Sequence, residues 1–152
     1  MHKQRIYIDT SVIGGCFDEE FAEWSNKLFE LVIKGQFIAI ITEVTISELV
    51  PAPEKVRNKI KEIPKEFTEF YDISDDARDL AAKYIEHNAI SRNFQEDALH
   101  IAMATILKAD VLISWNFKHI VNLRRIHLYN SINMMNEYQQ IEIRTPRELI
   151  NE

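Results

Sequence analysis

Cysteine is nearly absent from this sequence, and glycine and proline are scarce. One cysteine, three glycines and four prolines occur among 152 residues. Cys16 therefore has no disulfide partner within the chain. Met1 leads directly into a strand-like stretch, without the charged and then apolar segment that marks a secretory signal. These two features lead us to expect a protein of the reducing cytoplasm.

Long apolar runs are also missing. The most apolar segment, Ala98–Leu107, is interrupted by His100 and Thr105 and is much shorter than the roughly 20 residues that cross a bilayer. We therefore expect no membrane segment. Hydrophobic residues still make up 46% of the 152-residue chain, which is enough for one substantial core but too little for two ordinary domains. A single domain over residues 1–152 is expected, with no repeat, linker or low-complexity tract.

The sequence also lacks an excess of positive charge. The formal net charge is −6, which argues against a surface that coats nucleic acid by neutralising its phosphates. Any nucleic-acid site must therefore be local. The acidic balance is compatible with a cluster of carboxylates that binds cations, although acidic surface residues account for most such totals.

What the sequence does contain is short apolar runs that alternate with stretches of helical periodicity. Strands are predicted over residues 6–8, 37–41, 69–73, 111–114 and 141–144. Helices are predicted over residues 18–34, from 43 to near Pro51, and over 56–63, 77–85, 93–107 and much of 117–138. Strands separated by helices imply parallel pairing through right-handed crossovers. The sequence therefore predicts an α/β fold with a central parallel sheet.

Several residues are placed to begin or end these helices. Thr42 and Ser74 precede predicted helices as candidate N-caps, and Gly35 follows one as a candidate C-terminal cap. Asn93, with Glu96 three residues later, predicts a capping box. The helix that it opens is apolar nearly all round, so we expect this helix at the centre of the domain.

Polar residues follow two of the most apolar predicted strands. Asp9 comes directly after residues 6–8, and Asn116 lies just beyond residues 111–114. In parallel sheets, ligands gather beyond the carboxyl ends of the strands. If these two strands are neighbours, Asp9 and Asn116 open onto the same edge of the sheet.

Three acids are candidates for this edge, and each has an ordinary alternative. Asp9 can serve to cap the next turn, and Glu48 can be a plain solvent-facing residue of its helix. Asp97 lies in the first turn of the apolar helix, where the positive end of the helix dipole favours a carboxylate. It shares a helical face with Ile101 and Ala104, so we expect it to point inward.

Convergence of Asp9, Glu48 and Asp97 would require compensation of their charge. Two like charges about 4 Å apart repel by roughly 4 kcal/mol at an effective dielectric of about 20. Such acids must take up protons, pair with cations or bind metal, and an all-oxygen ligand set suits Mg²⁺ or Mn²⁺ better than zinc. Phosphodiester hydrolysis is the reaction class that suits such a site. His100 and His119 could act as bases or ligands, whereas a hydrogen-bonded structural role is the more common use of such histidines.

Four segments carry a family resemblance, in the order YIDTSVIGG, ISELV, EDALHIAMA and DVLISWNFKHI. Their order and spacing resemble the PIN domain family over nearly the whole chain. The ending IEIRTPRELI is similar to that of PIN toxins from bacterial or archaeal type II toxin–antitoxin pairs. The resemblance implies a PIN-like three-layer fold, with a central parallel sheet of about five strands flanked by helices. It also implies Mg²⁺ or Mn²⁺ at the carboxyl edge and endonucleolytic cleavage of RNA.

The acidic positions of the family map onto this sequence one by one. Asp9, Glu48 and Asp97 fall on the first three, as metal ligands and catalytic residues. Asn116 stands where many members have a fourth acid. An amide oxygen can ligate a cation or orient water but adds no negative charge, so the departure implies weaker metal binding. Asn116 could instead be a plain turn residue.

The candidate nucleic-acid contacts are basic and aromatic. Lys118, Arg124 and Arg125, together with His127, form the best local group for positioning RNA phosphates, although a solvated helix face is the simpler account. Trp115 could stack on a base, whereas an aromatic residue beside a sheet more often packs in the core. The resemblance further implies a protein antitoxin or a second copy of the chain as candidate partners for the first helices.

The leading hypothesis is therefore a metal-dependent endoribonuclease. A second hypothesis is a PIN-like module that binds RNA or a protein partner and has weak or no catalysis, because Asn116 replaces an acid. A third is a phosphotransfer domain with Asp9 as nucleophile. Such families carry a further acid near this aspartate or a phosphate-binding lysine after a later strand, and here position 11 is Ser11.

Overall fold

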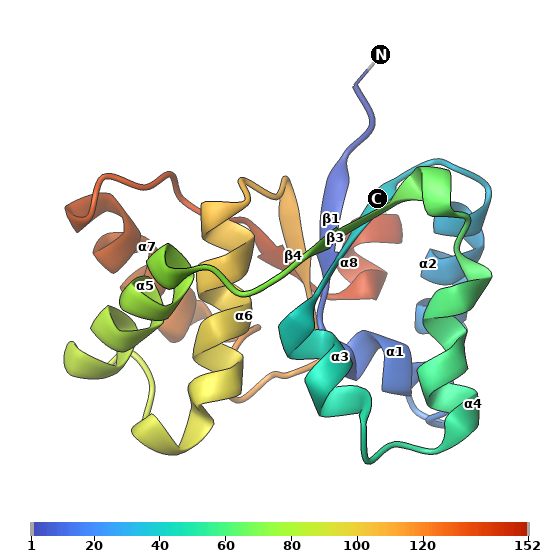
Figure 1. Cartoon of the computed structure of the whole chain (residues 1–152), viewed down its shortest axis with the longest axis horizontal. Coiled ribbons are helices and arrows are strands. Elements are labelled where there is room, and N and C mark those ends of the chain that lie inside the picture. The colour runs from blue at the N-terminus through green and yellow to red at the C-terminus, as the bar shows by residue number, and fades with distance from the viewer. Residues whose placement is uncertain (1, 152) are drawn as a thin grey trace.

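Five parallel strands form a single sheet in the computed structural model, which describes residues 2–151 (Figure 1). The strands are β1 (Arg5–Ile8), β2 (Ile38–Thr42), β3 (Thr68–Tyr71), β4 (Val111–Ile113) and β5 (Ile143–Arg144). Their order across the sheet is β3-β2-β1-β4-β5, and each neighbouring pair is parallel. The predicted α/β class and the central parallel sheet are confirmed.

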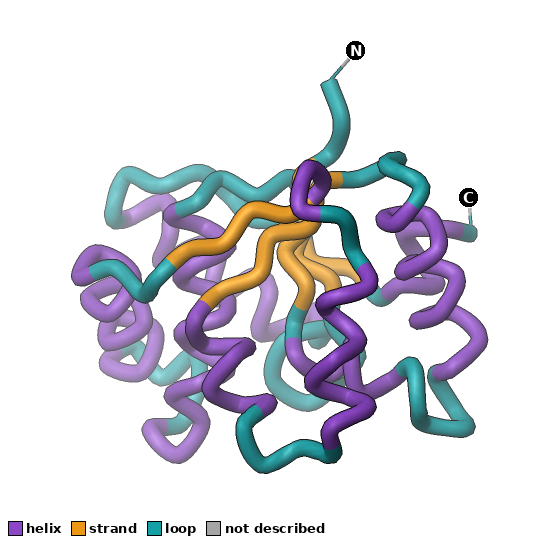
Figure 2. Tube along the Cα trace, turned by 45° about the vertical axis from the view of Figure 1, so that its right-hand side comes forward, coloured by secondary structure: helices purple, strands orange, loops and turns teal. Residues whose placement is uncertain are grey.

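Helices cover both faces of this sheet, as Figure 2 shows. They are α1 (Thr10–Gly15), α2 (Ala22–Ile33), α3 (Glu43–Leu49), α4 (Glu54–Arg57), α5 (Asp75–Glu86), α6 (Gln95–Ile106), α7 (Leu123–Met135) and α8 (Pro146–Ile150). Short 3₁₀ turns lie at η1 (Asn58–Glu62), η2 (Lys65–Phe67) and η3 (Arg92–Phe94). None of the helices within residues 2–151 is both long enough and apolar enough to cross a membrane.

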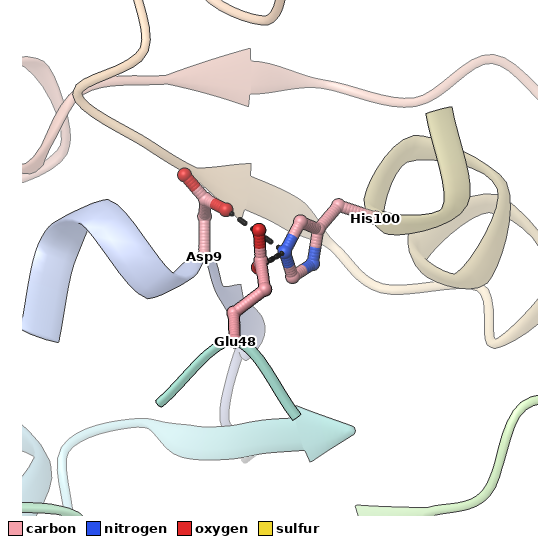
Figure 3. A group of neighbouring side chains, drawn as sticks. All are labelled: Asp9, Glu48 and His100. Carbon is pink, nitrogen blue, oxygen red and sulfur yellow. Dashed lines mark hydrogen bonds and ion pairs between the residues drawn. The ribbon is translucent and has the colours of Figure 1, made fainter. Parts of the chain in front are cut away.

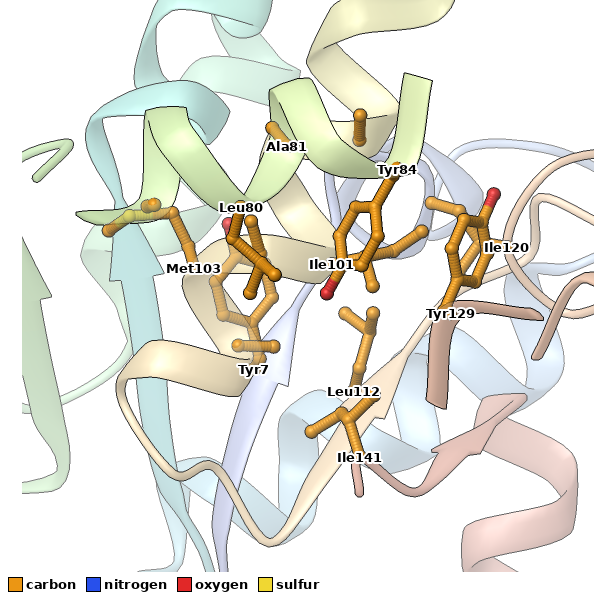
Figure 4. Close-up of a cluster of buried hydrophobic side chains, with 14 of the residues drawn as sticks. Tyr7, Leu80, Ala81, Tyr84, Ile101, Met103, Leu112, Ile120, Tyr129 and Ile141 are labelled. Atoms are coloured by element: carbon orange, nitrogen blue, oxygen red, sulfur yellow. The ribbon is translucent and has the colours of Figure 1, made fainter. Parts of the chain in front are cut away.

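Alternate residues of each central strand enter two separate cores. In β1, Tyr7 faces the core under α5, α6 and α7, whereas Ile6 and Ile8 face the core under α1 and α2. Figure 4 shows the first of these cores, with Tyr7 and Leu112 beneath the helices. Burial on both faces explains why the strands read as continuous apolar runs rather than as alternating ones.

The chain changes direction across the sheet between β1 and β4. It proceeds outward from β1 to β2 and β3, and then returns to place β4 on the other side of β1. Ile8 pairs with Ile113 at the carboxyl ends of these two strands. The expected neighbourhood of the two strands is therefore confirmed, and such a reversal of strand order leaves a crevice at the carboxyl edge.

Two of the predicted helix ends are confirmed. The Ser74 side chain accepts a hydrogen bond from the Ala77 backbone N–H at the start of α5. Gly35 has a φ of 83° beyond the end of α2, and its N–H donates to the Val32 carbonyl. Glycine adopts this left-handed conformation without the steric cost that a side chain would bring.

The predicted capping box at Asn93 and Glu96 is wrong. Asn93 lies inside the 3₁₀ turn η3, and α6 begins only at Gln95, where Phe94 provides no side-chain cap. Glu96 is exposed. The short turn displaces the helix start by two residues, so the asparagine does not stand at the position from which a side chain can cap the helix.

Candidate metal centre

Asp9 ends the central strand and lies almost completely buried at the crevice, with 4% of its surface exposed. Its Oδ2 atom accepts hydrogen bonds from the hydroxyls of Ser11 at 2.6 Å and Ser114 at 2.7 Å. The carboxylate makes no helix-capping bond to α1. The two hydroxyls instead fix the orientation of the carboxylate and leave its Oδ1 atom facing His100 of α6.

Glu48 reaches the same point from α3. Its Oε1 atom accepts a hydrogen bond from the Thr10 hydroxyl at 2.5 Å and lies 2.5 Å from Nε2 of His100. The Glu48 side chain retains 28% of its exposure, whereas that of Asp9 retains 5%. The Glu48 side chain is therefore partly accessible to solvent, whereas Asp9 is not. Glu48 is not a plain surface acid.

His100 lies between the two carboxylates and is completely buried (Figure 3). Its Nε2 atom lies 3.2 Å from Oδ1 of Asp9, in addition to its contact with Glu48. Its Nδ1 atom lies 2.7 Å from the Tyr7 hydroxyl, which in turn lies 2.8 Å from the Thr42 hydroxyl. Thr42 precedes α3 but does not cap it, because its hydroxyl is used inside this network.

The charged side chains at this site shift one another's pKa values. Burial lowers the pKa of His100, but the Asp9 and Glu48 carboxylates outweigh burial and raise it overall. Burial raises the pKa of Glu48, but the bonds from His100 and Thr10 outweigh burial and hold it below its usual range. Burial raises the pKa of the Tyr7 hydroxyl, so Tyr7 stays protonated. The group consists of two carboxylates that share one imidazole.

This arrangement fits a divalent cation. One ligand atom from each of Asp9, Glu48 and His100 can be chosen so that all three lie within 4.8 Å of one another. The set consists of two carboxylate oxygens and one imidazole nitrogen, contributed by β1, α3 and α6. Carboxylate oxygen and imidazole nitrogen are both common metal ligands. From the sequence, His100 is only one of two histidine candidates, although its position three residues after Asp97 places both residues on one helical face.

Asp97 lies beside this group rather than within it. Burial, followed by the negative charge of Asp9, raises the pKa of Asp97 to about 6. The charge of Glu48 adds to the increase, and the side-chain amide of Asn116 opposes it. The half-buried position of Asp97 agrees with the inward orientation expected from the sequence.

Asn116 uses its side-chain oxygen to shape a turn. Oδ1 of Asn116 accepts hydrogen bonds from the backbone N–H groups of Lys118 at 3.2 Å and His119 at 3.0 Å. Its remaining polar group is the NH₂, which is a donor, and this explains why Asn116 lowers the pKa of Asp97. Asn116 therefore has the turn role that the sequence allowed, and its role as a ligand or catalytic residue stays a prediction.

The predicted basic residues gather at one hollow. Lys118, Arg124 and Arg125 line a cavity of about 350 Å³ together with Asn88, Asn122 and Leu128. His127 does not join them, because it lines a different hollow with Lys108 and Arg144.

Trp115, the candidate for stacking on a base, and His119, a candidate base or ligand, are both packed inside the molecule. Trp115 is 8% exposed, stacks on Phe21 with ring centroids 4.5 Å apart, and donates from Nε1 to the Ser25 hydroxyl at 2.8 Å. His119 is 6% exposed and lies against Phe94, with ring centroids 3.9 Å apart. Trp115 therefore packs in the core, and the His119 ring packs against Phe94 rather than joining the group of Asp9, Glu48 and His100.

Comparison with known proteins supports the fold. No protein-family profile matches the sequence, and no curated protein shows significant similarity to it. The structure is similar to a chain in the crystal structure of VapBC2 from Rickettsia felis bound to a DNA fragment from their promoter. The TM-score is 0.57 at 13% sequence identity, and the match covers 93% of this chain and 98% of that chain. At such low identity the similarity shows a shared fold.

Proposed function

We propose that this chain is a metal-dependent endoribonuclease that cleaves RNA, and that it acts in the cytoplasm as the toxin of a toxin–antitoxin pair. The observation that carries the proposal is the meeting of Asp9, Glu48 and His100 at the reversal of strand order, with Asp97 beside them. Two carboxylates and an imidazole at the carboxyl edge of the sheet are a ligand set that can hold a divalent cation, and Mg²⁺ or Mn²⁺ is the cofactor proposed.

Each side chain at the site has a different proposed role in hydrolysis. A bound divalent ion would supply a water of lowered pKa and offset negative charge on the phosphoryl group. Asp9 and Glu48 would hold the ion, and Ser11 and Ser114 keep Asp9 in one orientation. Asp97 lies beside these ligands, where it is the proposed general acid or base.

The hollow lined by Lys118, Arg124 and Arg125 is the proposed contact for RNA phosphates. Asn122 caps the start of α7 by accepting a hydrogen bond from the Arg125 backbone N–H, and the first turn of α7 contains no acid. Three cations and the positive end of a helix thus face one cavity of about 350 Å³. A local basic site of this kind agrees with a protein whose net charge is −6.

The assignment to a toxin–antitoxin pair rests on two independent similarities. The sequence resembles PIN toxins in its ordered motifs and its ending, and the fold is shared with a chain of VapBC2, which was crystallised with promoter DNA. A protein antitoxin is therefore the proposed partner, and a homodimer is the proposed alternative assembly. The free and buried Cys16 is consistent with the reducing cytoplasm.

The test is RNA cleavage by the purified protein with Mg²⁺ or Mn²⁺, with and without EDTA. Asp9→Asn should lower the rate by more than the about 10- to 100-fold that follows loss of an outer partner of a metal ligand. Asp79→Asn on the exposed face of α5 is the matched control and should cleave at the wild-type rate. Wild-type cleavage that survives EDTA, or that is equalled by Asp9→Asn, would overturn the proposal.

The second candidate is a PIN-like module that binds RNA or a protein partner with little catalysis. It is favoured by the commitment of the Asn116 oxygen to a turn. Asn116→Asp keeps an oxygen for the same two N–H groups and adds a carboxylate beside Asp97. If the wild type binds RNA without cutting it and Asn116→Asp cuts it, this module is the correct description. Robust cleavage by the wild type rules it out.

A further inference from the structure

We propose that His100 is a direct metal ligand through Nε2, so that the site holds its ion with two carboxylate oxygens and one imidazole nitrogen and prefers Mn²⁺ to Mg²⁺. The inference rests on the metal dependence proposed above and defines the ligand set. Asp97, which is predicted from the sequence to be the third ligand, lies outside this set of direct ligands.

The distances among the donor atoms support direct ligation. Nε2 of His100 lies 3.2 Å from Oδ1 of Asp9 and 2.5 Å from Oε1 of Glu48. Neighbouring ligands on an octahedral ion with bonds of about 2.1 Å are about 3 Å apart. The contact between His100 and Asp9 is therefore already close to the separation of adjacent ligands, whereas the contact with Glu48 has to lengthen.

The Nδ1 side of the imidazole ring is held by a hydrogen bond, as is usual for a metal-bound histidine. Metal-bound histidines usually bond their second ring nitrogen to a fixed partner, which sets the orientation of the ring. Here Nδ1 lies 2.7 Å from the Tyr7 hydroxyl, which lies 2.8 Å from the Thr42 hydroxyl. The Tyr7 oxygen can accept a hydrogen bond from Nδ1–H while its O–H donates one to the Thr42 hydroxyl, which leaves the Nε2 lone pair free for an ion.

Because His100 is completely buried, its Nε2 atom can interact only with the groups that surround it. The imidazole has no exposed surface, and Nε2 reaches Asp9, Glu48 and, more distantly, the Thr10 hydroxyl at 3.5 Å. If His100 served only as a permanent positive partner of the carboxylates, a divalent ion held by Asp9 and Glu48 would lie next to a second positive charge. Direct ligation removes that repulsion.

The nitrogen ligand determines which ion the site prefers. Mg²⁺ is a hard ion that favours oxygen ligands and retains its waters, whereas imidazole favours transition metals. A site with one imidazole should therefore bind Mn²⁺ at least about 10-fold more tightly than Mg²⁺. An all-carboxylate site would lack this source of discrimination.

Pulsed electron paramagnetic resonance of the Mn²⁺-loaded protein tests the ligand directly. An imidazole bound to Mn²⁺ produces modulation from ¹⁴N, and biosynthetic labelling with ¹⁵N-histidine should shift its frequency without any mutation. His100→Gln should abolish this modulation and weaken Mn²⁺ binding by about 10-fold or more, with a smaller loss for Mg²⁺. His87→Gln, on the exposed surface, is the matched control and should keep both the modulation and the affinity.

Three results would overturn the inference. They are the absence of Mn²⁺ binding, Mn²⁺ binding without histidine modulation in the wild type, and unchanged modulation in His100→Gln. The first two are read from the wild-type protein, so they do not depend on the folding of any variant. RNA cleavage is scored separately. Mg²⁺-supported cleavage without histidine modulation would reject His100 as a ligand but support the ribonuclease proposal. Mn²⁺ bound by His100 without RNA cleavage would support the ligand but reject the ribonuclease proposal.

Discussion

The Tyr7 hydroxyl lies 2.7 Å from Nδ1 of His100 and thereby links the central strand to α6 inside the core. Both side chains are completely buried, and the same hydroxyl also contacts Thr42 at 2.8 Å. One oxygen atom of Tyr7 thus connects three elements, β1, β2 and α6, directly behind the carboxylate pair. The first prediction concerns this oxygen.

Tyr7→Phe should destabilise the protein by about 1–3 kcal/mol, because it leaves buried polar groups of His100 and Thr42 without a partner while preserving the ring. Equilibrium unfolding in urea measures the loss. Tyr71→Phe is the control, since the Tyr71 hydroxyl donates to Glu69 in a part-exposed position on the edge strand. Its loss should be smaller, because water can replace the missing bond. Equal losses in the two variants would contradict the special role of Tyr7.

The two glycines of α1 should respond in opposite directions to alanine. A Cβ atom at Gly15 would lie 2.6 Å from the Ser25 hydroxyl and 2.9 Å from Nε1 of Trp115, whereas one at Gly14 meets nothing within 4 Å. Gly15→Ala should therefore cost about 1–3 kcal/mol of stability through overpacking. Gly14→Ala should gain up to about 1 kcal/mol, because alanine is the better helix former. Thermal unfolding of both variants checks the pair, and a tolerated Gly15→Ala would show that the packing can relax.

His119 should make the protein less stable as the pH falls below about 6.5. Burial, followed by the charges of Arg125 and Lys118, lowers the pKa of His119 in the folded state. Between the lowered folded pKa and the usual value near 6.5, the unfolded chain therefore binds more protons at this residue. Stability from His119 is present above that window and is lost as the pH falls through it.

Urea unfolding of the wild type and His119→Gln at pH 7.5 and pH 5.5 isolates this contribution. His100 has a raised pKa and so contributes in the opposite direction, but it is present in both proteins and cancels from their difference. The wild type should lose more stability than the variant on acidification. A smaller loss in the wild type would contradict the lowered pKa of His119.

The basic hollow should determine the salt dependence of RNA binding. With cleavage blocked by Asp9→Asn, Lys118→Ala and Arg124→Ala should each reduce the slope of log affinity against log salt concentration by about 0.7 for single-stranded RNA. Arg125 is a poorer choice because its guanidinium donates to the Ala89 carbonyl at 2.7 Å and so supports the fold. Lys61→Ala, exposed on η1, is the control and should leave the slope unchanged. Unchanged slopes in both Lys118→Ala and Arg124→Ala would remove the hollow from the RNA contact.

The local features of the sequence predicted much of the fold because they act over short distances. Continuous apolar runs indicated strands that are buried on both faces, and helical periodicity located α2, α5 and α6. The six-residue α1 and the five-residue α8 were not predicted, since helices of that length show little periodicity. The capping box failed for a similar reason, because a 3₁₀ turn at Arg92–Phe94 shifted the start of α6.

The amino-acid sequence by itself determined the alternation of strands and helices, the positions of Asp9 and Asn116 after two strands, and the acids available to the site. Only the tertiary structure decided which side chains meet. Ser114 reaches Asp9, and Glu48 reaches His100, across separations of 105 and 52 residues. Sheet order and helix packing set such contacts, and neither is encoded in the local spacing of residues. The fold therefore placed a histidine, rather than a third carboxylate, between the two acids.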